Sequence, residues 1–469
     1  MPDEAQATGS GGVADDRRVR WFQGVPRYAW VVLIVCALGW LFDTMDQHLF
    51  TLVRQPSVKE LMAANGVVGP GLDAAAKEVG AQITAVFLLG WAFGGAGFGI
   101  IGDRLGRTRT MMLTILTYAA FTGLNALVQA PWQYAVCRFL TAMGVGGEFA
   151  AGAALVAEVW PERSRPMALG LLQALSAVGN MTAAVITLVL SAYSWRFVYL
   201  VGAVPALLVI WVYAGVREPE RWQRAHDEAA RDRARKELGA ISDLFRQPHL
   251  RRNTIAGVLL ATAGVAGAWG VGFFLADLVG SALAPMVRAL PEMAALSGAE
   301  QTRAVNAALT AYRSKVFFVQ QIGAFIGMFG YAAVSQRIGR KPAMAIVFVG
   351  AFLAVEATFW LLKDPLSAYL LAFPLGVFAL APFSAYAVYF PELFPTRLRA
   401  TGIGFCYNVA RVVAAAAPFV LGKLSTHFAS PVDETAGLRV AASIVALVYG
   451  VGLLGLVWAP ETRGEPLPE

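Results

Sequence analysis

The sequence predicts an all-α membrane protein in which twelve transmembrane helices form two pseudo-symmetric six-helix bundles. Three observations support this fold class: an apolar composition, apolar runs long enough to cross a bilayer, and motifs that occur once in each half. Hydrophobic residues make up 57% and charged residues 15% of the 469 residues, far from the averages of soluble domains. The net charge of +7 reflects the basic loops of membrane proteins, so nucleic-acid binding is not needed to explain it.

Twelve apolar segments, most of them about 20 residues or longer, follow one another along the chain. Helices need this length to cross hydrocarbon, whereas the strands of a membrane β-barrel alternate over about ten residues. Two long loops, 54–78 and 282–313, are expected on the outer side, the second partly helical near 299–312. The expected spans are 28–53, 79–101, 110–129, 133–157, 166–190, 196–215, 253–281, 314–334, 342–362, 366–390, 400–425 and 437–459.

A long charged segment separates the sixth span from the seventh. Most Lys and Arg residues of the loops fall on the side that holds this segment and both chain ends, which predicts that this side is cytoplasmic. The N-terminal tail lacks the apolar core of a signal peptide, and the composition points to a bacterial inner (plasma) membrane. The expected parts are a cytosolic tail (1–27), a six-helix bundle (28–215), a cytosolic linker (216–252), a second six-helix bundle (253–459) and a cytosolic C-terminal tail (460–469).

Two charged motifs occur once in each half. Residues 102–109 read Gly-Asp-Arg-Leu-Gly-Arg-Thr-Arg, and 335–341 repeat them more weakly as Ser-Gln-Arg-Ile-Gly-Arg-Lys. Residues 158–165 read Glu-x-x-Pro-x-Arg-x-Arg, and the same pattern returns at 392–399. The nearly equal separations indicate a duplicated unit. Because both copies lie on one side of the membrane, each unit needs an even number of spans.

The charged side chains of these motifs are expected to form a gate on the cytosolic side. Ion pairs there can hold the outward-open state and must break when the two halves rock. The alternative is that these charges only determine topology, but the repeated spacing of acids and arginines favours the gate. The expected gate residues are Asp103, Arg104, Arg107, Glu158, Arg163, Arg165, Glu392, Arg397 and Arg399.

Carboxylates inside two spans are the expected proton-coupling sites. Asp43 and Asp46 lie about one turn apart on nearly one face of the first span, where two ionised carboxylates repel each other. Glu148, in the middle of the fourth span, is a further proton site. The alternatives are an ion pair with Arg138 that only fixes the first helix on the fourth, and a Glu148 hydrogen-bonded among close-packed glycines.

Arg411 in the eleventh span is the principal substrate-binding residue of this prediction. Arginine stays charged in any plausible pocket, and its planar fork matches a carboxylate through two hydrogen bonds. Trp269, Phe273 and Phe274 in the seventh span are expected to form an apolar wall. The expected substrate-binding residues are Arg411, Asn408, Tyr407, Arg138, Gln173 and Gln320.

Through these motifs the chain resembles the major facilitator superfamily over nearly its whole length. Residues 102–107 are similar to that superfamily's loop between helices 2 and 3, and 335–341 to its loop between helices 8 and 9. Within the superfamily the chain looks most like proton-coupled organic-acid symporters, the aromatic-acid, sialate and metabolite:proton branches, although the ending at 460–464 is similar to that of sugar porters. The closer resemblance rests on residues 42–46, 138–148 and 391–411.

The resemblance implies a secondary transporter that works by alternating access and is not an enzyme. We expect it to couple proton entry to uptake of a small organic anion, a carboxylate metabolite, with the proton as coupling ion and no cofactor or metal. Its expected partners are the substrate and the lipid bilayer, without nucleic acid, and we expect a monomer. The alternatives are a symporter for a sugar or neutral metabolite, a uniporter, and a transport-inactive membrane sensor. No role is assigned to Glu356 or Asp277.

Overall fold

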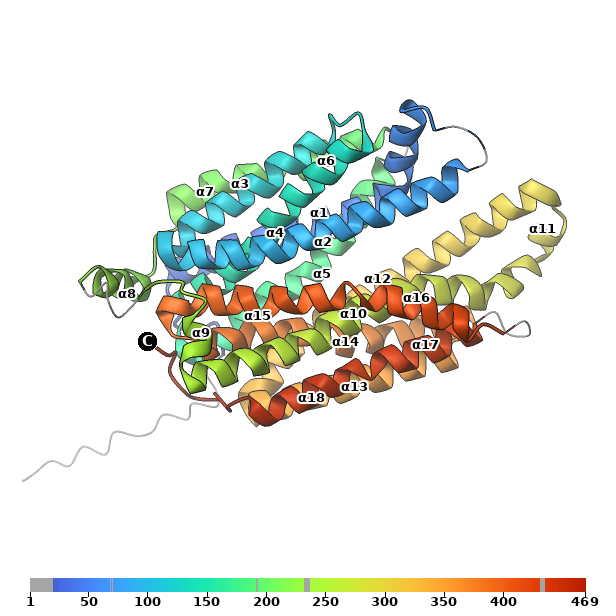
Figure 1. The fold of residues 1–469 in the computed structure, drawn as a ribbon. Helices are drawn as coiled ribbons and strands as arrows, with labels where there is room; N and C mark the ends of the chain where they lie inside the picture. Colours follow the sequence, from blue (N-terminus) through green and yellow to red (C-terminus); the bar gives the residue numbers. More distant parts are fainter. Residues whose placement is uncertain (1–19, 68, 70, 191–192, 232–236, 431–434) are drawn as a thin grey trace, which may run out of the picture.

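The computed structural model describes residues 20–67, 69, 71–190, 193–231, 237–430 and 435–469, so most of the predicted N-terminal tail lies outside the described residues. The described residues form helices and connecting turns, without a strand among them. Long helices run side by side, and the short helices of the linker lie at one end together with the C-terminus (Figure 1). We call this end the linker side and the opposite end the far side.

The first half contains five long helices and a sixth span built from shorter pieces. The sixth span is interrupted around Pro205, which has no backbone N–H to continue the helical ladder. The elements are α1 (Arg27–Ala64), α2 (Leu72–Leu105), α3 (Arg107–Asn125), α4 (Pro131–Val159), η1 (Glu162–Ser164), α5 (Arg165–Val189), α6 (Trp195–Gly202), η2 (Val204–Leu207) and α7 (Leu208–Gly215).

The linker forms two short helices, α8 (Glu220–Arg231) and α9 (Asp243–Arg246). Trp222 is the buried residue of α8, and its Nε1 donates a hydrogen bond to the backbone oxygen of Asp103 at 2.7 Å. The linker therefore packs against the linker-side end of α2.

The second half repeats the order of the first. Its helices include a four-residue turn at the far side, and its last two spans are each split into two helices. The elements are α10 (Pro248–Arg288), α11 (Pro291–Ala294), α12 (Gly298–Ile338), α13 (Arg340–Leu361), α14 (Pro365–Leu393), η3 (Thr396–Leu398), α15 (Arg399–Ala414), α16 (Ala417–His427), α17 (Ala436–Ala446) and α18 (Val448–Trp458).

Two glycines show that the halves share one backbone design. Gly106 separates α2 from α3 with φ 108°, and Gly339 separates α12 from α13 with φ 102°. These positive φ angles favour glycine, since a Cβ atom would clash with the backbone. The 3₁₀ turns η1 and η3 likewise precede α5 and α15. The pseudo-symmetry predicted from the repeated motifs is thus confirmed at the level of the backbone.

By length and apolar character, ten helices in the described residues qualify as membrane spans. The two predicted spans that do not qualify are the third and the eleventh. Helix α3 has only 19 residues and carries two arginines among its first three, and the eleventh span is interrupted between α15 and α16. Both still run along the bundle beside the other helices (Figure 1).

The prediction of two long outer loops is wrong, but the helix expected near 299–312 is confirmed, since α12 contains it. Helix α1 continues to Ala64 and α2 already begins at Leu72, while α10 extends to Arg288 and α12 begins at Gly298. The helices continue because Val58, Leu61 and Met62 are buried beyond the end of the apolar run. Such an amphipathic extension carries charges, and hydropathy alone therefore ends the span too early.

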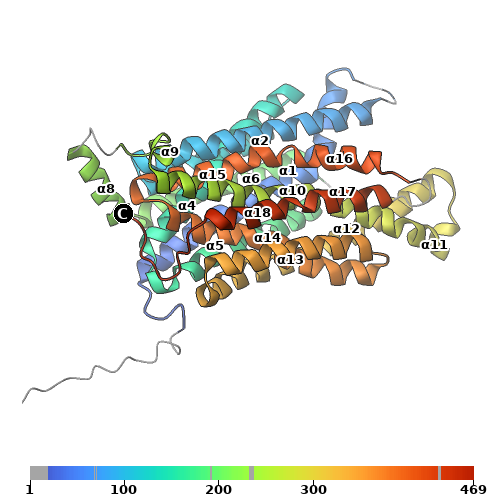
Figure 2. The ribbon, with the colours of Figure 1, turned by 60° about the horizontal axis from the view of Figure 1, so that its bottom comes forward.

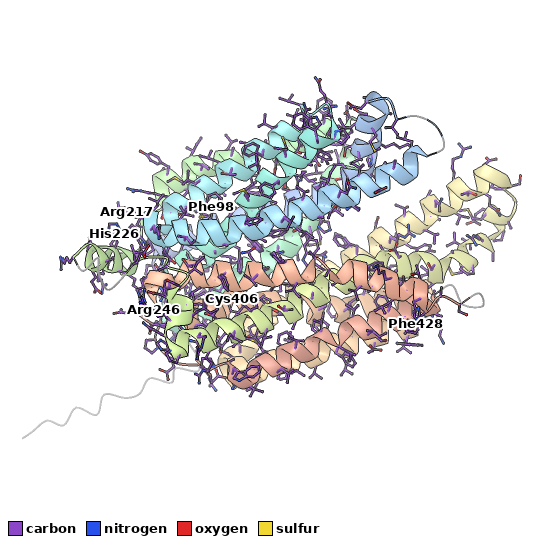
Figure 3. The ribbon with its side chains drawn as sticks, in the orientation of Figure 1. Phe98, Arg217, His226, Arg246, Cys406 and Phe428 are labelled. Atoms are coloured by element: carbon purple, nitrogen blue, oxygen red, sulfur yellow. The ribbon has the colours of Figure 1, made fainter. Side chains whose placement is uncertain are left out.

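The two halves meet along α2 and α15 on one side and along α5 and α12 on the other. Two views of the molecule show α15 lying between α2 and α10 (Figures 1 and 2). Cys406 of α15 lies buried inside this contact region, whereas Phe428 lies at the far side and Arg217 and His226 at the linker side (Figure 3).

Glycines on α2 allow close contact with α4. A Cβ atom at Gly94 would lie 2.1 Å from the backbone oxygen of Met143, and one at Gly90 would lie 2.3 Å from that of Phe139. A Cβ atom at Gly97, on the same helix, would meet nothing within 4 Å. Small residues of this kind let membrane helices approach backbone to backbone.

We expect Gly94→Ala to destabilise the protein by about 1–3 kcal/mol, because α2 and α4 must move apart. Gly97→Ala is the matched control, since it replaces a glycine of the same helix in open space. The measurement is the apparent melting temperature of each purified variant in detergent. Equal melting temperatures for the two variants would contradict the close contact.

Candidate functional site

A cavity of about 510 Å³ lies between the two halves. Side chains from α1, α2, α5, α10, α12, α14 and α15 line it, and it extends from Tyr407 at mid-depth to Thr310 near the far side. Its size lies within the range of small-molecule sites. Its polar lining residues include Thr44, Gln47, His48, Gln173, Ser176, Asn180, Gln320, Gln321, Tyr407 and Arg411, and its aromatic ones Trp40, Trp91, Trp269, Phe317, Phe318 and Phe383.

Arg411 lies in the wall of this cavity between two aromatic rings. Its Cζ is 3.6 Å from the ring centroid of Trp91 and 4.4 Å from that of Tyr407. The side chain is buried, and its Nε and Nη1 have no hydrogen-bond partner. Within the described residues no carboxylate forms an ion pair with it. The site therefore presents a cation that is held by π-faces and is open to an anion.

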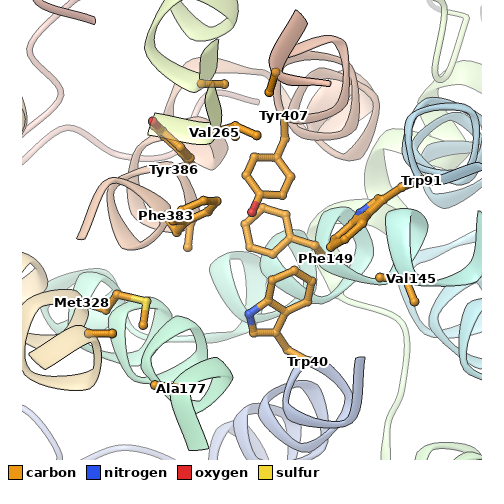
Figure 4. Close-up of a cluster of buried hydrophobic side chains, with 14 of the residues drawn as sticks. Trp40, Trp91, Val145, Phe149, Ala177, Val265, Met328, Phe383, Tyr386 and Tyr407 are labelled. Atoms are coloured by element: carbon orange, nitrogen blue, oxygen red, sulfur yellow. The ribbon is translucent and has the colours of Figure 1, made fainter. Parts of the chain in front are cut away.

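Three rings that contact one another through Phe149, tilted against one another, close the cavity toward the linker side. Phe149 lies 4.9 Å from Trp40 and 4.6 Å from Tyr407, measured between ring centroids. The three rings lie one above another, with Trp91 beside them (Figure 4). We call Trp40, Phe149 and Tyr407 the aromatic floor. It joins α1 and α4 of the first half to α15 of the second.

Asp46 forms an ion pair with Arg138, the alternative considered from the sequence. Arg138 Nη2 lies 3.0 Å from Asp46 Oδ2, both side chains are fully buried, and Thr122 donates to Asp46 Oδ1 at 2.7 Å. The rings of Phe50 and Phe87 cover the guanidinium. Arg138 does not line the cavity, so its expected role in substrate binding has no support in its position.

Asp43 and Glu148 differ from Asp46 because neither has a cationic side chain as an ion-pair partner in the described residues. Both are buried, none of their four carboxyl oxygens has a hydrogen-bond partner, and no ion pair to either is found among the described residues. The two carboxyl groups are neighbours, although no well-formed hydrogen bond joins them. Gly39 makes room for Glu148, since a Cβ atom there would lie 1.8 Å from Oε1. The structure thus brings Asp43 together with Glu148 and leaves Asp46 to Arg138.

Of the remaining residues predicted to bind substrate, some line the cavity and one lies in the contact between the two halves. Gln173 and Gln320 line the cavity, and Gln173 Oε1 has no partner. Asn408 instead faces Gly95 of α2 and donates to the backbone oxygen of Gly404. Trp269 lines the cavity as predicted, whereas the side chain of Phe273 lies outside the described residues.

Four buried charges form a network across the halves on the linker side. Arg107 lies 2.7 Å from Asp103 and 3.0 Å from Glu158, and Glu158 also lies 2.7 Å from Arg399 of the second half. The carboxylate of Asp103 accepts hydrogen bonds from the backbone N–H groups of residues 400 and 401 at the start of α15. We call Asp103, Arg107, Glu158 and Arg399 the linker-side network. It closes this end of the molecule.

The other predicted gate residues lie outside this network. Their partners are as follows: Arg104 pairs with Glu237, Arg165 with Glu162, Arg397 with Asp243 and Arg340 with Glu392, while the backbone oxygen of Arg163 accepts a hydrogen bond from Gln336. Only the last of these contacts joins the first half to the second. The others hold the linker or a single half together.

Sequence reasoning missed two glutamates that cap helices of the repeat. Glu218 accepts hydrogen bonds from the backbone N–H groups of residues 108 and 109, and Glu461 accepts them from residues 340 and 341. Although partial burial acts to raise the pKa of Glu461, the backbone donors hold that pKa below its ordinary value. Each glutamate follows the last span of its half, which is a repeat signal in the sequence.

The C-terminal tail also contacts the linker-side network. The backbone oxygen of Pro468 accepts a hydrogen bond from Arg399 Nη2 at 2.6 Å, and Leu467 is buried. This contact has no signal in the sequence, because a backbone oxygen is available at every residue.

The fold and the cavity define a class of protein, the secondary transporters with two repeated helical bundles. The family model of the Major Facilitator Superfamily matches residues 60–299, and the chain belongs to that superfamily. It is a transporter of small organic substrates and not an enzyme. The superfamily fold implies twelve transmembrane helices, so α3 and the split α15–α16 complete the ten that qualify by length and apolar character.

Individual relatives of known or assigned substrate, and one solved structure, are similar to most of the chain. The chain is 30% identical over 435 residues to a probable 4-methylmuconolactone transporter of Cupriavidus pinatubonensis, covering 92% of this chain and 90% of that protein. It is 26% identical over 444 residues to the sialic acid transporter NanX of Escherichia coli, covering 93% and 95%. The solved structure of the proton:xylose symporter XylE superposes with a TM-score of 0.69 at 17% identity, covering 94% and 98%, which shows the shared fold.

We expect Asp46→Asn to lower the apparent melting temperature strongly. The substitution leaves the buried Arg138 without its acid, which typically costs about 3–5 kcal/mol. Asp43→Asn is the matched control, because it removes a neighbouring carboxylate that has no cation. The measurement is thermal unfolding of the purified variants in detergent. A larger loss in Asp43→Asn than in Asp46→Asn would contradict this assignment of partners.

We expect Glu158→Gln to open the linker side. The substitution removes the carboxylate that binds both Arg107 of the first half and Arg399 of the second. The reporter is Thr401→Cys, a buried position whose maleimide labelling rate should rise severalfold. Glu162→Gln is the control, since Glu162 lies at the same side but is half exposed. An unchanged rate in Glu158→Gln would show that its ion pairs do not hold this end closed.

Proposed function

We propose that this protein is a symporter that couples proton entry to uptake of a small organic anion. The observation that carries the proposal is Arg411, a buried guanidinium in the cavity wall without a carboxylate partner among the described residues. A buried cation is costly unless something nearby supplies negative charge. The carboxylate of a substrate would supply that charge and accept two hydrogen bonds from the guanidinium fork.

The aromatic lining supports a flat or cyclic acid as the substrate. Trp91 and Tyr407 hold Arg411 between their rings, so little conformational entropy is lost when an anion binds. The rings of Trp269 and Trp91 form a T-shaped pair, and Trp269 offers a further apolar surface. Relatives named as transporters of muconate, sialic acid and niacin support the same substrate class.

Asp43 and Glu148 are the proposed proton-coupling residues. Two buried carboxyl groups side by side without a cation cannot both stay ionised at low cost, so the pair is suited to hold a proton. Asp46, which the sequence also suggested, is not a coupling residue in this proposal, because it forms an ion pair with Arg138.

A continuous chain of contacts connects the proton site to the anion site. Glu148 directly precedes Phe149 of the aromatic floor, and Phe149 packs on Tyr407, whose ring lies against Arg411. On the other helix, Trp40 lies about one turn before Asp43. Protonation of the carboxyl pair would therefore act on the same rings that position Arg411, which supports coupling through the aromatic floor.

The closed linker-side network suits an outward-facing state. In the proposed topology the linker side and both termini are cytoplasmic, the protein is a monomer in the bacterial inner membrane, and the cavity receives substrate from outside. Alternating access then requires the ion pairs of Glu158 to break while contacts near the far side form.

A sugar or another neutral metabolite is the second possibility. The observation in its favour is a group of amides in the cavity: Gln173, Gln320, Gln321 and Asn180, of which Asn180 donates to Gln321 at 3.0 Å. Amides of this kind suit hydroxyl groups, and the fold is shared with a xylose symporter. A uniporter would lack the proton step, and no feature of the described residues favours a sensor.

The test is substrate-induced proton movement in proteoliposomes that contain a pH-sensitive dye. Aromatic acids, small monocarboxylates and dicarboxylates, sialic acid and hexoses are compared at one external pH. Acidification of the lumen by acids and not by hexoses is the expected result. Acidification by hexoses alone would overturn the anion proposal, and acid uptake without acidification would overturn proton coupling.

Variants assign the two roles in the same assay. We expect Arg411→Lys to raise the half-saturating acid concentration about tenfold or more, because an ammonium lacks the two-point fork. Asp43→Asn is expected to retain substrate exchange but to lose uphill uptake driven by a proton gradient. An unchanged apparent affinity in Arg411→Lys would contradict the proposal that Arg411 binds the substrate carboxylate.

A further inference from the structure

A second cavity of about 330 Å³ adjoins the central one. Arg411 and Trp269 line both, so the two cavities meet at the proposed anion site. The second cavity extends between α2 and α10 and includes Arg54 of α1 and Thr84 of α2 in its wall. Two arginines thus line one cavity.

Arg54 resembles Arg411 because neither forms an ion pair with a carboxylate of the described residues. Its Nη1 donates to Thr84 Oγ1 at 2.6 Å, which fixes the end of the side chain against α2. In the part of the chain that the structure describes, no carboxylate forms an ion pair with it. The side chain is partly buried, and a cation held there by a hydroxyl group retains donors for an anion.

The one acid in the wall of this cavity, among the described residues, lies near a different arginine. Asp277 lines the second cavity, and Arg313 of α12 lies beside it, with its Nε bound to the backbone oxygen of Ala276 at 2.9 Å. Among the described residues, Asp277 forms an ion pair with neither Arg54 nor Arg411. Arg54 and Arg411 therefore remain as two positive charges without an ion-pair partner in the described residues.

The spacing of the two arginines follows from α2. Arg54 is anchored at Thr84, and Arg411 lies over Trp91, seven residues further along the same helix. Seven residues are close to two turns, so both anchors lie on one face of α2 about 10 Å apart. An acid with two carboxyl groups separated by about four carbon atoms spans much of this distance, and charge-assisted hydrogen bonds of about 2.8 Å cover the remainder.

We propose that Arg54 and Thr84 form a second anion subsite and that the substrate is a dicarboxylate, with one carboxylate on Arg411 and the other on Arg54. The inference rests on the proposed function, because it assumes that Arg411 binds a carboxylate. It adds that the site distinguishes diacids from monoacids. A monoacid of equal length would leave Arg54 without a counterion.

The test compares ligands that differ only in the second carboxylate. The pairs are trans,trans-hexa-2,4-dienedioate with trans,trans-hexa-2,4-dienoate, and adipate with hexanoate. Binding to the purified full-length protein is measured by tryptophan fluorescence, to which Trp91 and Trp269 in the cavity walls contribute. The wild-type protein is expected to bind each diacid at least tenfold more tightly than its monoacid. Equal affinities, or no diacid binding, would overturn the proposal.

Three variants separate this inference from the proposed function. Arg54→Gln should weaken diacid binding about tenfold and leave monoacid binding within twofold, whereas Arg411→Gln should weaken both. Arg288→Gln is the control for general charge, because it removes an exposed arginine of the far side that lines neither cavity.

Equal effects of Arg54→Gln on both ligand classes, or no effect on diacids, would overturn the second subsite while leaving Arg411 as the carboxylate site. If Arg411→Gln instead leaves every acid unaffected, the proposed function itself fails.

Discussion

The ion pairs of Glu158 are the interaction on which the arrangement of the two halves depends. One carboxylate from the first half binds Arg107 of its own half and Arg399 of the other, all out of contact with solvent. Buried charges of this kind are stable only as a complete set, so the two halves are fixed together at this end. Because the linker side is closed in this way, the cavity can open only toward the far side.

The buried charges fall into two kinds, and the difference separates structure from function. Asp46 with Arg138 is complete: each has its partner and further polar or aromatic contacts. Asp43, Glu148 and Arg411 are incomplete, and each lies within about one helical turn of a residue of the aromatic floor along the chain or in contact with its ring. Incomplete buried charges are tolerated where a ligand or a proton completes them. We therefore base the proposed proton and anion sites on the missing partners of these groups, more than on their burial.

The sequence was sufficient for the fold because apolar length and repeated motifs are local signals. It also placed Arg411 and Gln173 in the site, since polar residues inside spans are rare. It was insufficient for the partners: Asp43 and Asp46 are equivalent in the sequence, and only packing against α4 gives one of them Arg138 and the other Glu148. It missed the role of Trp91 because an aromatic residue in a span has no feature that separates packing from binding.

Under the proposed function, electrostatics explains why proton and substrate must move together. When the halves rock, the aromatic floor opens, and the surroundings of the charged groups beside it change. With Arg411 unneutralised, or with both carboxyls of Asp43 and Glu148 ionised, the rearrangement would carry uncompensated charge through a region of low dielectric. An anion on Arg411 and a proton on the carboxyl pair remove both charges. Since Tyr407 and Phe149 contact each other across the halves, the two events share one barrier.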